Sequence, residues 1–242
     1  QARRRFYGDS PAGIELGGYR ADLPAVTPQT LKAEYDRILR TAAIDVMVQG
    51  ADAANVAERL LCALEKVPRA PQLFAGAMAT PEDLPSINLL RMAMSVFGGS
   101  TTSRLFRNVR EKQSLCYYCG ATALRATGVM MVDSGVEPGR EAEAEAAILK
   151  ELDDLRRGPI TGEEMENSRR SLLSGLDALG DSLSGIESWY YGQIVRDEPL
   201  APPAYGRVLV SAVKADEVRE LLAGYHYSVC YAVTGQQKGG QA

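Results

Sequence analysis

The chain has 242 residues, 45% of them hydrophobic and 24% charged, which is enough for one or two globular domains with buried cores. Its 31 acidic and 27 basic residues give a formal net charge of −4, a balance that argues against nucleic acid or a membrane surface as a partner. No apolar run of about 18 residues is present, so the sequence predicts no transmembrane helix.

The cysteines and the single histidine limit the chemistry that the chain can perform. Four cysteines do not resemble the disulfide framework of a secreted domain, so we expect a cytoplasmic location. Most zinc sites and many acid–base sites use histidine, and only His226 is available for such a site. The chain begins at Gln1 in the middle of a pattern and shows no signal peptide, so we expect it to be part of a longer protein.

Residues 1–66 are predicted to form the C-terminal part of a first α/β domain. Thr27 and Pro28 suit the N-cap and the first position of a helix, and apolar residues then recur on one face of that helix. The β-branched run 44–50 ends in glycine and predicts a strand, and a second amphipathic helix follows it. Prolines and charged residues then interrupt the pattern, so we expect a linker at 67–72.

Residues 73–236 are predicted to form a second domain, followed by a tail at 237–242. Its expected strands are 73–79, 114–124, 128–137 and 226–235. Its expected helices are 81–97, 103–113, 141–158, 161–179, 182–194 and 214–222. The second and third strands form a hairpin in this prediction. The order of elements predicts the α+β class, with an antiparallel sheet that has helices packed on one face.

Cys116 and Cys119 have the spacing of a redox dithiol or of half a zinc site. Leu115, Tyr117 and Tyr118 surround them with a strand-like run, whereas a reactive dithiol occupies a helix N-terminus that lowers the thiol pKa. Residues three apart on a regular strand point to opposite faces, so we expect the two sulfurs to diverge. A zinc site would need two further ligands. The sequence therefore favours a structural role for both cysteines.

Arg110 and Tyr117 are a second candidate pair, seven residues apart. Arg110 comes late in the predicted helix 103–113, and Tyr117 lies on the strand that follows. A turn between them could bring both side chains to one edge of the sheet. A guanidinium and a phenol can each donate a hydrogen bond to a carbonyl or a developing oxyanion. The alternative, which the residues alone favour, is a surface cation and a core aromatic.

The segment 97–118, FGGSTTSRLFRNVREKQSLCYY, resembles the second-half signature of the insulinase/pitrilysin-like zinc metallopeptidases, which include the mitochondrial processing peptidases. In that signature a Gly-rich turn leads into a helix of the form SRLF-x-x-x-REK and then a strand with L-x-Y. VTPQTLKAEYDRIL and IDVMVQG resemble the helix and strand that close the first half of family members, and RRGPITGEEMENSRRSLL resembles part of their second domain. Within the family, the residues of this segment are most similar to those of a bacterial branch that lacks the zinc motif.

This resemblance implies a pitrilysin-like domain, derived from a ferredoxin-like arrangement, that is non-catalytic. The family's Arg and Tyr fall on Arg110 and Tyr117, where they would bind substrate by reaching across to an active site in the other half. The implied partners are a peptide or small protein substrate and a zinc-bearing homologous subunit or half, which would make a dimer. Peptide substrates of the family add as a strand to a sheet edge.

Two departures from the family pattern limit what this chain can do. The family's zinc motif is His-x-x-Glu-His, which one histidine cannot make, so we expect no catalytic residue and no bound cofactor here. Zinc is expected in the partner half or in a segment that precedes Gln1. Residues 66–80 are also shorter than the corresponding segment of family members. Three hypotheses follow: a zinc-less subunit that binds peptide, a parent chain that is itself an active peptidase, or a scaffold with a vestigial site.

Overall fold

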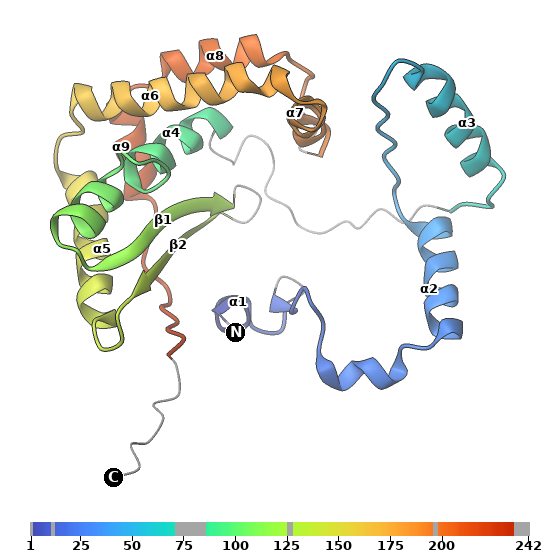
Figure 1. The fold of residues 1–242 in the computed structure, drawn as a ribbon, viewed down its shortest axis with the longest axis horizontal. Coiled ribbons are helices and arrows are strands. Elements are labelled where there is room, and N and C mark those ends of the chain that lie inside the picture. Colours follow the sequence, from blue (N-terminus) through green and yellow to red (C-terminus); the bar gives the residue numbers. More distant parts are fainter. Residues whose placement is uncertain (1, 11–12, 71–85, 125–127, 196–197, 235–242) are drawn as a thin grey trace. The chain divides into compact units, whose positions relative to one another are not determined.

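The computed structural model describes residues 2–10, 13–70, 86–124, 128–195 and 198–234 (Figure 1). The chain divides into two compact units. The first unit comprises residues 1–77 together with 228–231, and the second unit comprises residues 78–227 together with 232–242. The predicted strand 73–79 and the tail 237–242 lie outside the described residues. Each unit is described in turn.

The first unit is helical throughout its described residues. Its elements are α1 (Ala2–Tyr7), the 3-10 helix η2 (Arg20–Ala25), α2 (Pro28–Thr41) and α3 (Ala53–Glu65). The predicted N-cap of α2 is confirmed, because the Thr27 hydroxyl accepts a hydrogen bond from the Thr30 N–H at 3.1 Å. At the other end of α2, the Arg69 guanidinium donates to the carbonyl oxygens of Leu39 at 2.8 Å and Ala42 at 2.6 Å. These contacts satisfy backbone groups that a helix leaves unpaired at its ends.

The strand predicted at 44–50 is wrong, because these residues belong to no β-ladder. A strand is stabilised by hydrogen bonds to a neighbouring strand, and the described residues of the first unit contain none. The strand predicted at 226–235 is wrong for the same reason over residues 226–234, which also belong to no β-ladder. The alternating apolar pattern was present in both segments, but no partner strand stands beside either of them among the described residues.

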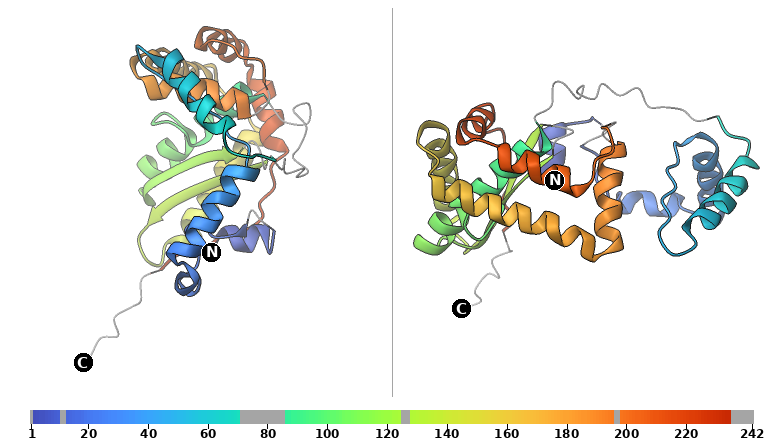
Figure 2. Two further views of the ribbon diagram at one scale, coloured as in Figure 1. Left: turned by 90° about the vertical axis from the view of Figure 1, so that its right-hand side faces the viewer. Right: turned by 90° about the horizontal axis from the view of Figure 1, so that it is seen from above.

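The second unit contains a two-stranded antiparallel hairpin, β1 (Cys116–Leu124) and β2 (Val129–Val136), and most of the helices. Its first helices are α4 (Ile87–Phe97), the π-helix η4 (Leu105–Lys112) and α5 (Glu141–Arg157). The later helices are α6 (Gly162–Asp177), η6 (Ala178–Asp181), α7 (Leu183–Val195), α8 (Pro203–Ala212) and α9 (Ala215–Ala223). α6 and α8 lie side by side (Figure 1, Figure 2). The predicted α+β class is confirmed.

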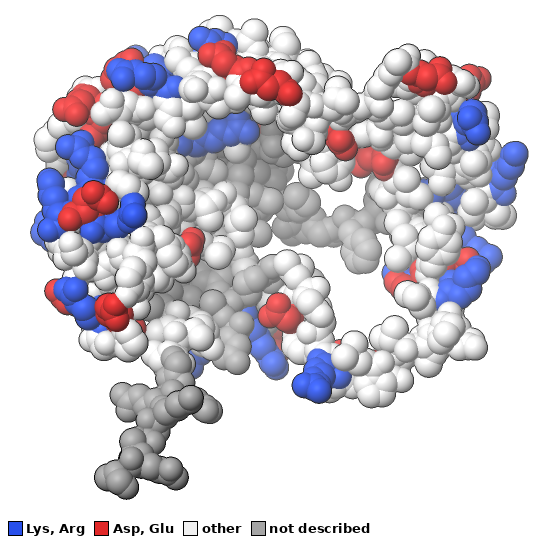
Figure 3. Space-filling view, viewed as in Figure 1, with Lys and Arg blue, Asp and Glu red and all other residues white. Residues whose placement is uncertain are grey.

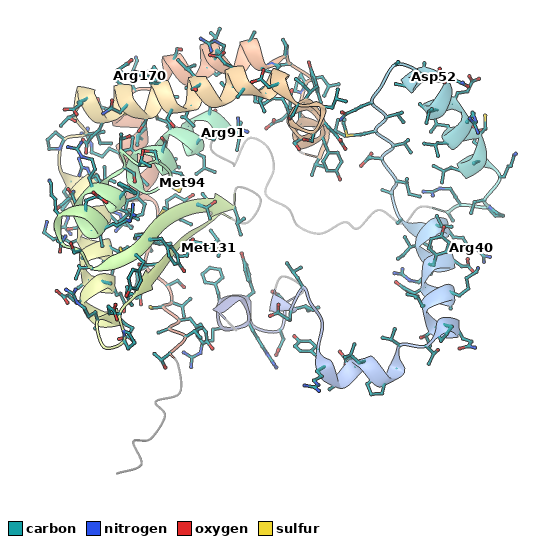
Figure 4. The ribbon with its side chains drawn as sticks, in the orientation of Figure 1. Arg40, Asp52, Arg91, Met94, Met131 and Arg170 are labelled. Atoms are coloured by element: carbon teal, nitrogen blue, oxygen red, sulfur yellow. The ribbon has the colours of Figure 1, made fainter. Side chains whose placement is uncertain are left out.

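The core of the second unit lies between α4, η4, the inner face of the hairpin, α5 and α9. Its fully buried large side chains include Met92, Phe97, Leu105, Val109, Leu155, Val218 and Leu222. Met94 of α4 belongs to this core, whereas Met131 of β2 is exposed on the outer side of the hairpin (Figure 4). Burial therefore alternates along the hairpin, as expected for a sheet with helices on one face.

The predicted capping box at the start of α6 is confirmed and extends to a second helix. Thr161 accepts a hydrogen bond from the Glu164 N–H at 3.2 Å, and the Glu164 carboxylate accepts one from the Thr161 N–H at 2.8 Å. The same carboxylate pairs with Arg104 at 2.6 Å, so the start of η4 is tied to the start of α6. Among the described helices, none is both long and apolar enough to cross a lipid bilayer.

Candidate functional site

Arg110 and Tyr117 are brought together where η4 leads into β1. The Arg110 Nε donates a hydrogen bond to the main-chain oxygen of Tyr117 at 2.9 Å. The short segment between them contains Ser114, the one described non-glycine residue with a positive φ, at 49°. A left-handed serine costs conformational energy, so this turn is held by its surroundings. The turn brings the Arg110 side chain to the backbone of Tyr117.

The Arg110 guanidinium is held from three sides. Its carbon lies 4.5 Å from the centre of the Phe106 ring, one helical turn earlier on η4. Its Nη1 lies 3.6 Å from the Glu111 carboxylate, and its Nε is fixed by Tyr117. The side chain nevertheless remains 37% exposed. Arg110 is therefore an oriented cation at the surface, not a freely moving one.

Tyr117 is exposed and donates its phenol O–H to the carboxylate of Glu137, which directly follows β2. Glu137 is the site residue that the sequence reasoning missed. No signal in the sequence marks it, because the bulge places Tyr117 next to the Cys116–Val136 pair, and its side chain reaches Glu137 from there. A cation, a phenol and a carboxylate thus meet at this end of the hairpin.

The helix that carries Arg110 is a π-helix, in which each N–H bonds the carbonyl five residues earlier. The Gln113 N–H, for example, donates to the Asn108 oxygen at 3.2 Å. π-Helices are rare and recur at functional sites, because the extra residue in a turn changes the direction of the side chains. In η4, the Arg110 side chain reaches the Tyr117 carbonyl from this π-helical conformation.

A β-bulge corrects the expectation for Cys116 and Cys119. The hairpin register shifts between Cys116 and Tyr118, so an extra residue enters β1 there. Tyr117 and Tyr118 are consequently both exposed, and both cysteines pack on the core side of the hairpin. The predicted divergence of the two sulfurs is wrong, because it assumed a regular strand without a bulge.

The two thiols also contact one another. Burial raises the pKa of the Cys119 thiol to about 12, with further increases from the nearby Cys116 thiol, which also forms a hydrogen bond with it, and from the Asp133 carboxylate. A hydrogen bond with the Ser134 hydroxyl lowers this pKa by a smaller amount. None of the four cysteines, all of them described residues, is joined in a disulfide.

The surface around η4 has two open hollows of ≈ 420 Å³ and ≈ 560 Å³. Both are lined in part by Thr102, Arg107, Lys112 and Glu163, and neither is lined by Arg110 or Tyr117. On the face seen in Figure 3, basic and acidic side chains are interleaved over η4 and α5. The candidate pair thus lies outside both of these hollows, with both side chains exposed to solvent.

The described residues do not fit a zinc ion. No group of three or more His, Cys, Asp or Glu side chains in that part of the chain is placed to hold a metal. The whole sequence has one histidine, His226, so it cannot supply the two histidines of a His-x-x-Glu-His motif. Any metal chemistry associated with this domain would need ligands from elsewhere.

Comparisons with known proteins define the class of this domain. Residues 59–172 match the family model described as the Peptidase M16 inactive domain, and this segment contains both Arg110 and Tyr117. The predicted resemblance to the zinc metallopeptidase family, in its non-catalytic second half, is confirmed. Residues 59–172 are therefore similar to the inactive domain of zinc protease-like proteins.

Particular relatives agree with this assignment. The chain is 27% identical over 114 residues to the Bacillus subtilis (strain 168) protein named "Probable inactive metalloprotease YmfF", covering 47% of this chain and 26% of the relative. It is 31% identical over 96 residues to "Uncharacterized zinc protease YmxG" of the same organism, covering 37% of this chain and 24% of the relative. The matches thus span about a quarter of the length of these curated relatives.

A solved structure supports the fold. The peptidase M16 inactive domain from Pseudomonas fluorescens superposes with a TM-score of 0.75 at 19% sequence identity, covering 93% of this chain and 61% of that one. At this identity the likeness establishes the fold, and the roles of individual residues are argued from their chemistry.

Proposed function

We propose that this chain supplies the non-catalytic half of an M16-type zinc peptidase. In this proposal Arg110 and Tyr117 bind the peptide substrate and complete an active site that a zinc-bearing homologous half carries. The observation that supports it best is the hydrogen bond of 2.9 Å from Arg110 Nε to the Tyr117 main-chain oxygen, which holds the Arg110 side chain next to Tyr117 at an exposed place. A rare helix type and a strained serine occur where Arg110 is oriented, and such features recur at functional sites.

The pair would act by donating hydrogen bonds to peptide carbonyls. Arg has five N–H donors and keeps its charge at all physiological pH values, so the Nε bond to Tyr117 leaves most of the guanidinium's donors for other acceptors. The Tyr117 phenol would turn its O–H from Glu137 to a substrate carbonyl. The Glu137 carboxylate would then accept a backbone N–H of the same peptide. An extended peptide offers both kinds of group along one edge, and the open surface would admit it.

The zinc ion would be contributed by the other half. Its chemistry when bound is to polarise the scissile carbonyl and activate water. Residues of this chain would bind and orient the peptide and would hold no metal. We place the assembled dimer in the cytoplasm, in keeping with the few cysteines of the chain.

Two alternatives predict different observations. If the parent chain is itself an active peptidase, its own sequence upstream of Gln1 contains His-x-x-Glu-His, and sequencing the gene settles this. If the domain is a scaffold, changes at Arg110 and Tyr117 leave peptide cleavage by the assembled enzyme untouched. Neither alternative is favoured by a contact of the described residues.

The test is peptide cleavage by the assembled enzyme with Arg110→Ala or Tyr117→Phe. We expect kcat/KM to fall about 10- to 100-fold for Arg110→Ala, since a hydrogen bond from a charged donor contributes about 1.5–3 kcal/mol. A fall of about 5-fold is expected for Tyr117→Phe, which removes a neutral donor. Unchanged cleavage in both variants would support the scaffold alternative.

Matched controls separate this role from a general loss of structure. Arg107→Ala removes another half-exposed cation of η4, which lies 3.9 Å from Glu163. Tyr118→Phe removes the hydroxyl of the neighbouring exposed tyrosine. Both controls should keep cleavage within about 2-fold of the parent, and all four variants should still co-elute with the zinc-bearing half in size-exclusion chromatography.

A further inference from the structure

The bulge in β1 creates a thiol pair that a regular strand would not have. Cys116 pairs with Val136 across the hairpin, and Cys119 pairs with Ser134. Val136 and Ser134 are two residues apart on β2 and therefore lie on the same face of it. Their partners Cys116 and Cys119 are consequently neighbours on one face, although they are three residues apart in the sequence.

The spacing that this register imposes is at the upper end of what a disulfide tolerates. Two residues along a strand correspond to about 6.6 Å, from a rise of about 3.3 Å per residue. Disulfides join Cα atoms about 4.4–6.8 Å apart, and those formed near a limit store strain and are more easily reduced. The register places the two thiols near one another, and Cys116 is half-buried whereas Cys119 is buried. An attacking reagent would therefore reach Cys116 first.

We propose that Cys116 and Cys119 are a redox-modification site, at which small-molecule disulfides such as oxidised glutathione convert the two thiols into a reversible intramolecular disulfide. This site is independent of the proposed peptide-binding role. The disulfide would affect the bulge first, because Cys116 and Cys119 flank Tyr117 and Tyr118 and would be joined to one another. Both tyrosines would then be held on the outer side of the hairpin.

The reaction balances in two exchange steps. The Cys116 thiol loses its proton to solvent, and its sulfur attacks one sulfur of oxidised glutathione, whose S–S bond breaks and releases one glutathione thiolate that takes up a proton. Cys119 then loses its proton and attacks the Cys116 sulfur, releasing the second glutathione. Two protein thiols are oxidised to one disulfide, and one glutathione disulfide is reduced to two thiols.

The second step should be slow at neutral pH and faster in base. Burial, the Cys116 thiol and the Asp133 carboxylate raise the pKa of Cys119 to about 12, so its thiolate is scarce at pH 7. Below that pKa the thiolate fraction rises about tenfold per pH unit. The rate of ring closure should rise with it between pH 7 and pH 9.

The experiment treats the folded, intact chain with excess oxidised glutathione, blocks remaining thiols with iodoacetamide and digests with trypsin. Cleavage after Lys112 and Arg125 releases peptide 113–125, which contains both cysteines of the pair and no other. We expect this peptide to be lighter than the reduced peptide by two hydrogen atoms, with no alkyl group and no glutathione attached. Dithiothreitol should restore two thiols.

Variants give an independent readout in a chain where Cys62→Ser and Cys230→Ser remove the two exposed thiols. Cys119→Ala should stop the reaction at one glutathione on Cys116, and Cys116→Ala should slow any modification of peptide 113–125 by at least tenfold. The proposal is overturned if the unmutated peptide keeps two alkylatable thiols at pH 9. It is equally overturned if a stable glutathione adduct persists there, or if the disulfide forms only in denaturant.

Discussion

Helices α2 and α3 of the first unit and helices α4 and α9 of the second unit all have amphipathic sequences, but only those of the second unit bury their apolar sides. α2 and α3 have no buried residue, and Leu31 of α2 is 63% exposed. In α4, by contrast, Met92 and Phe97 are fully buried. The pattern specifies a helix in both cases, and burial depends on a surface to pack against. In the second unit α4 packs chiefly against α6 and α9, and α9 packs against α4 and α5.

The largest expected effect follows directly from this difference. Phe97→Ala should lower the free energy of unfolding of the second unit by about 3–5 kcal/mol, because it removes a fully buried aromatic side chain and leaves a cavity. Leu31→Ala should change the stability by less than about 0.5 kcal/mol. In urea denaturation, far-ultraviolet circular dichroism reports on the helices of both units, and the fluorescence of Trp189, the single tryptophan and a residue of α7, reports on the second unit. A comparable loss in both variants would break the comparison.

Close packing between elements of the second unit predicts the next effect. A Cβ atom on Gly98 would lie 2.7 Å from the Ala121 nitrogen and 2.8 Å from a methyl carbon of Leu105, so Gly98→Ala should cost about 2 kcal/mol. Gly175→Ala, in the last turn of α6 with open space around it, should instead stabilise by about 0.5 kcal/mol. The same denaturation assay measures both changes. A neutral Gly98→Ala would mean that the end of α4 moves easily away from β1.

Ion pairs sharpen the comparison, because a pair of the same length lies in each unit. Glu164 and Arg104 lie 2.6 Å apart with side chains only 15% and 13% exposed, and Glu34 and Arg37 lie 2.6 Å apart on the exposed surface of α2. Burial raises the Glu164 pKa, but the hydrogen bonds from Arg104 and Thr161 outweigh it, and the pKa is lowered from 4.5. Glu164→Gln should cost about 1–2 kcal/mol at pH 7.

The pH dependence has a definite sign. Because the folded-state pKa of Glu164 lies below the unfolded value, its contribution is present above about pH 4.5 and is lost as the pH falls through the folded-state pKa. The parent should therefore lose stability on acidification below pH 4.5 more steeply than Glu164→Gln. The Arg37 hydrogen bond also lowers the Glu34 pKa, but this pair is exposed to solvent, so Glu34→Gln should change the profile much less than Glu164→Gln. Parallel acid profiles for the parent and Glu164→Gln would contradict this assignment.

The smallest effect concerns left-handed backbone. In the first unit the described residues with positive φ are the glycines Gly8, Gly18 and Gly50, whereas the second unit places Ser114 at a φ of 49° between Arg110 and Tyr117. Ser114→Gly should stabilise by about 0.5 kcal/mol, since the relief of strain exceeds the entropy that glycine adds to the unfolded chain. Ser114→Val should destabilise by about 1–2 kcal/mol. If Ser114→Val instead raised the free energy of unfolding, the turn would have relaxed to another conformation.

Local signals in the sequence predicted most of the second unit. The capping box at Thr161, the stop at Gly158 and the alternation in the hairpin residues each depend on neighbours in the chain, and each was found where expected. The strands predicted at 44–50 and 226–235 failed because strand formation depends on a partner distant in sequence. Periodicity shows that a segment could be a strand but not that a partner stands beside it.

In the candidate site, too, some features could be predicted from the sequence and others could not. The adjacency of Arg110 and Tyr117 followed from their spacing and a turn, and their role in binding substrate stays a prediction. The bulge between Cys116 and Tyr118 could not be predicted, because an unpaired extra residue leaves no mark in the composition of the strand. Glu137 was missed because a carboxylate at the end of a hairpin acquires its partner only through the register of the two strands.

The π-helix η4 makes the spacing of this site sensitive to chain length. Deleting one residue from η4 would let the remainder adopt the more stable α-helical hydrogen bonding, and would turn Arg110 by about 100° relative to the end of α4. The guanidinium would then leave Phe106 and the Tyr117 carbonyl together. A search for related domains that keep the Arg and the Tyr should therefore give more weight to gaps within η4 than to substitutions. A sequence alignment would still match both residues to Arg110 and Tyr117 across a single-residue gap, although in the structure the gap would move them apart.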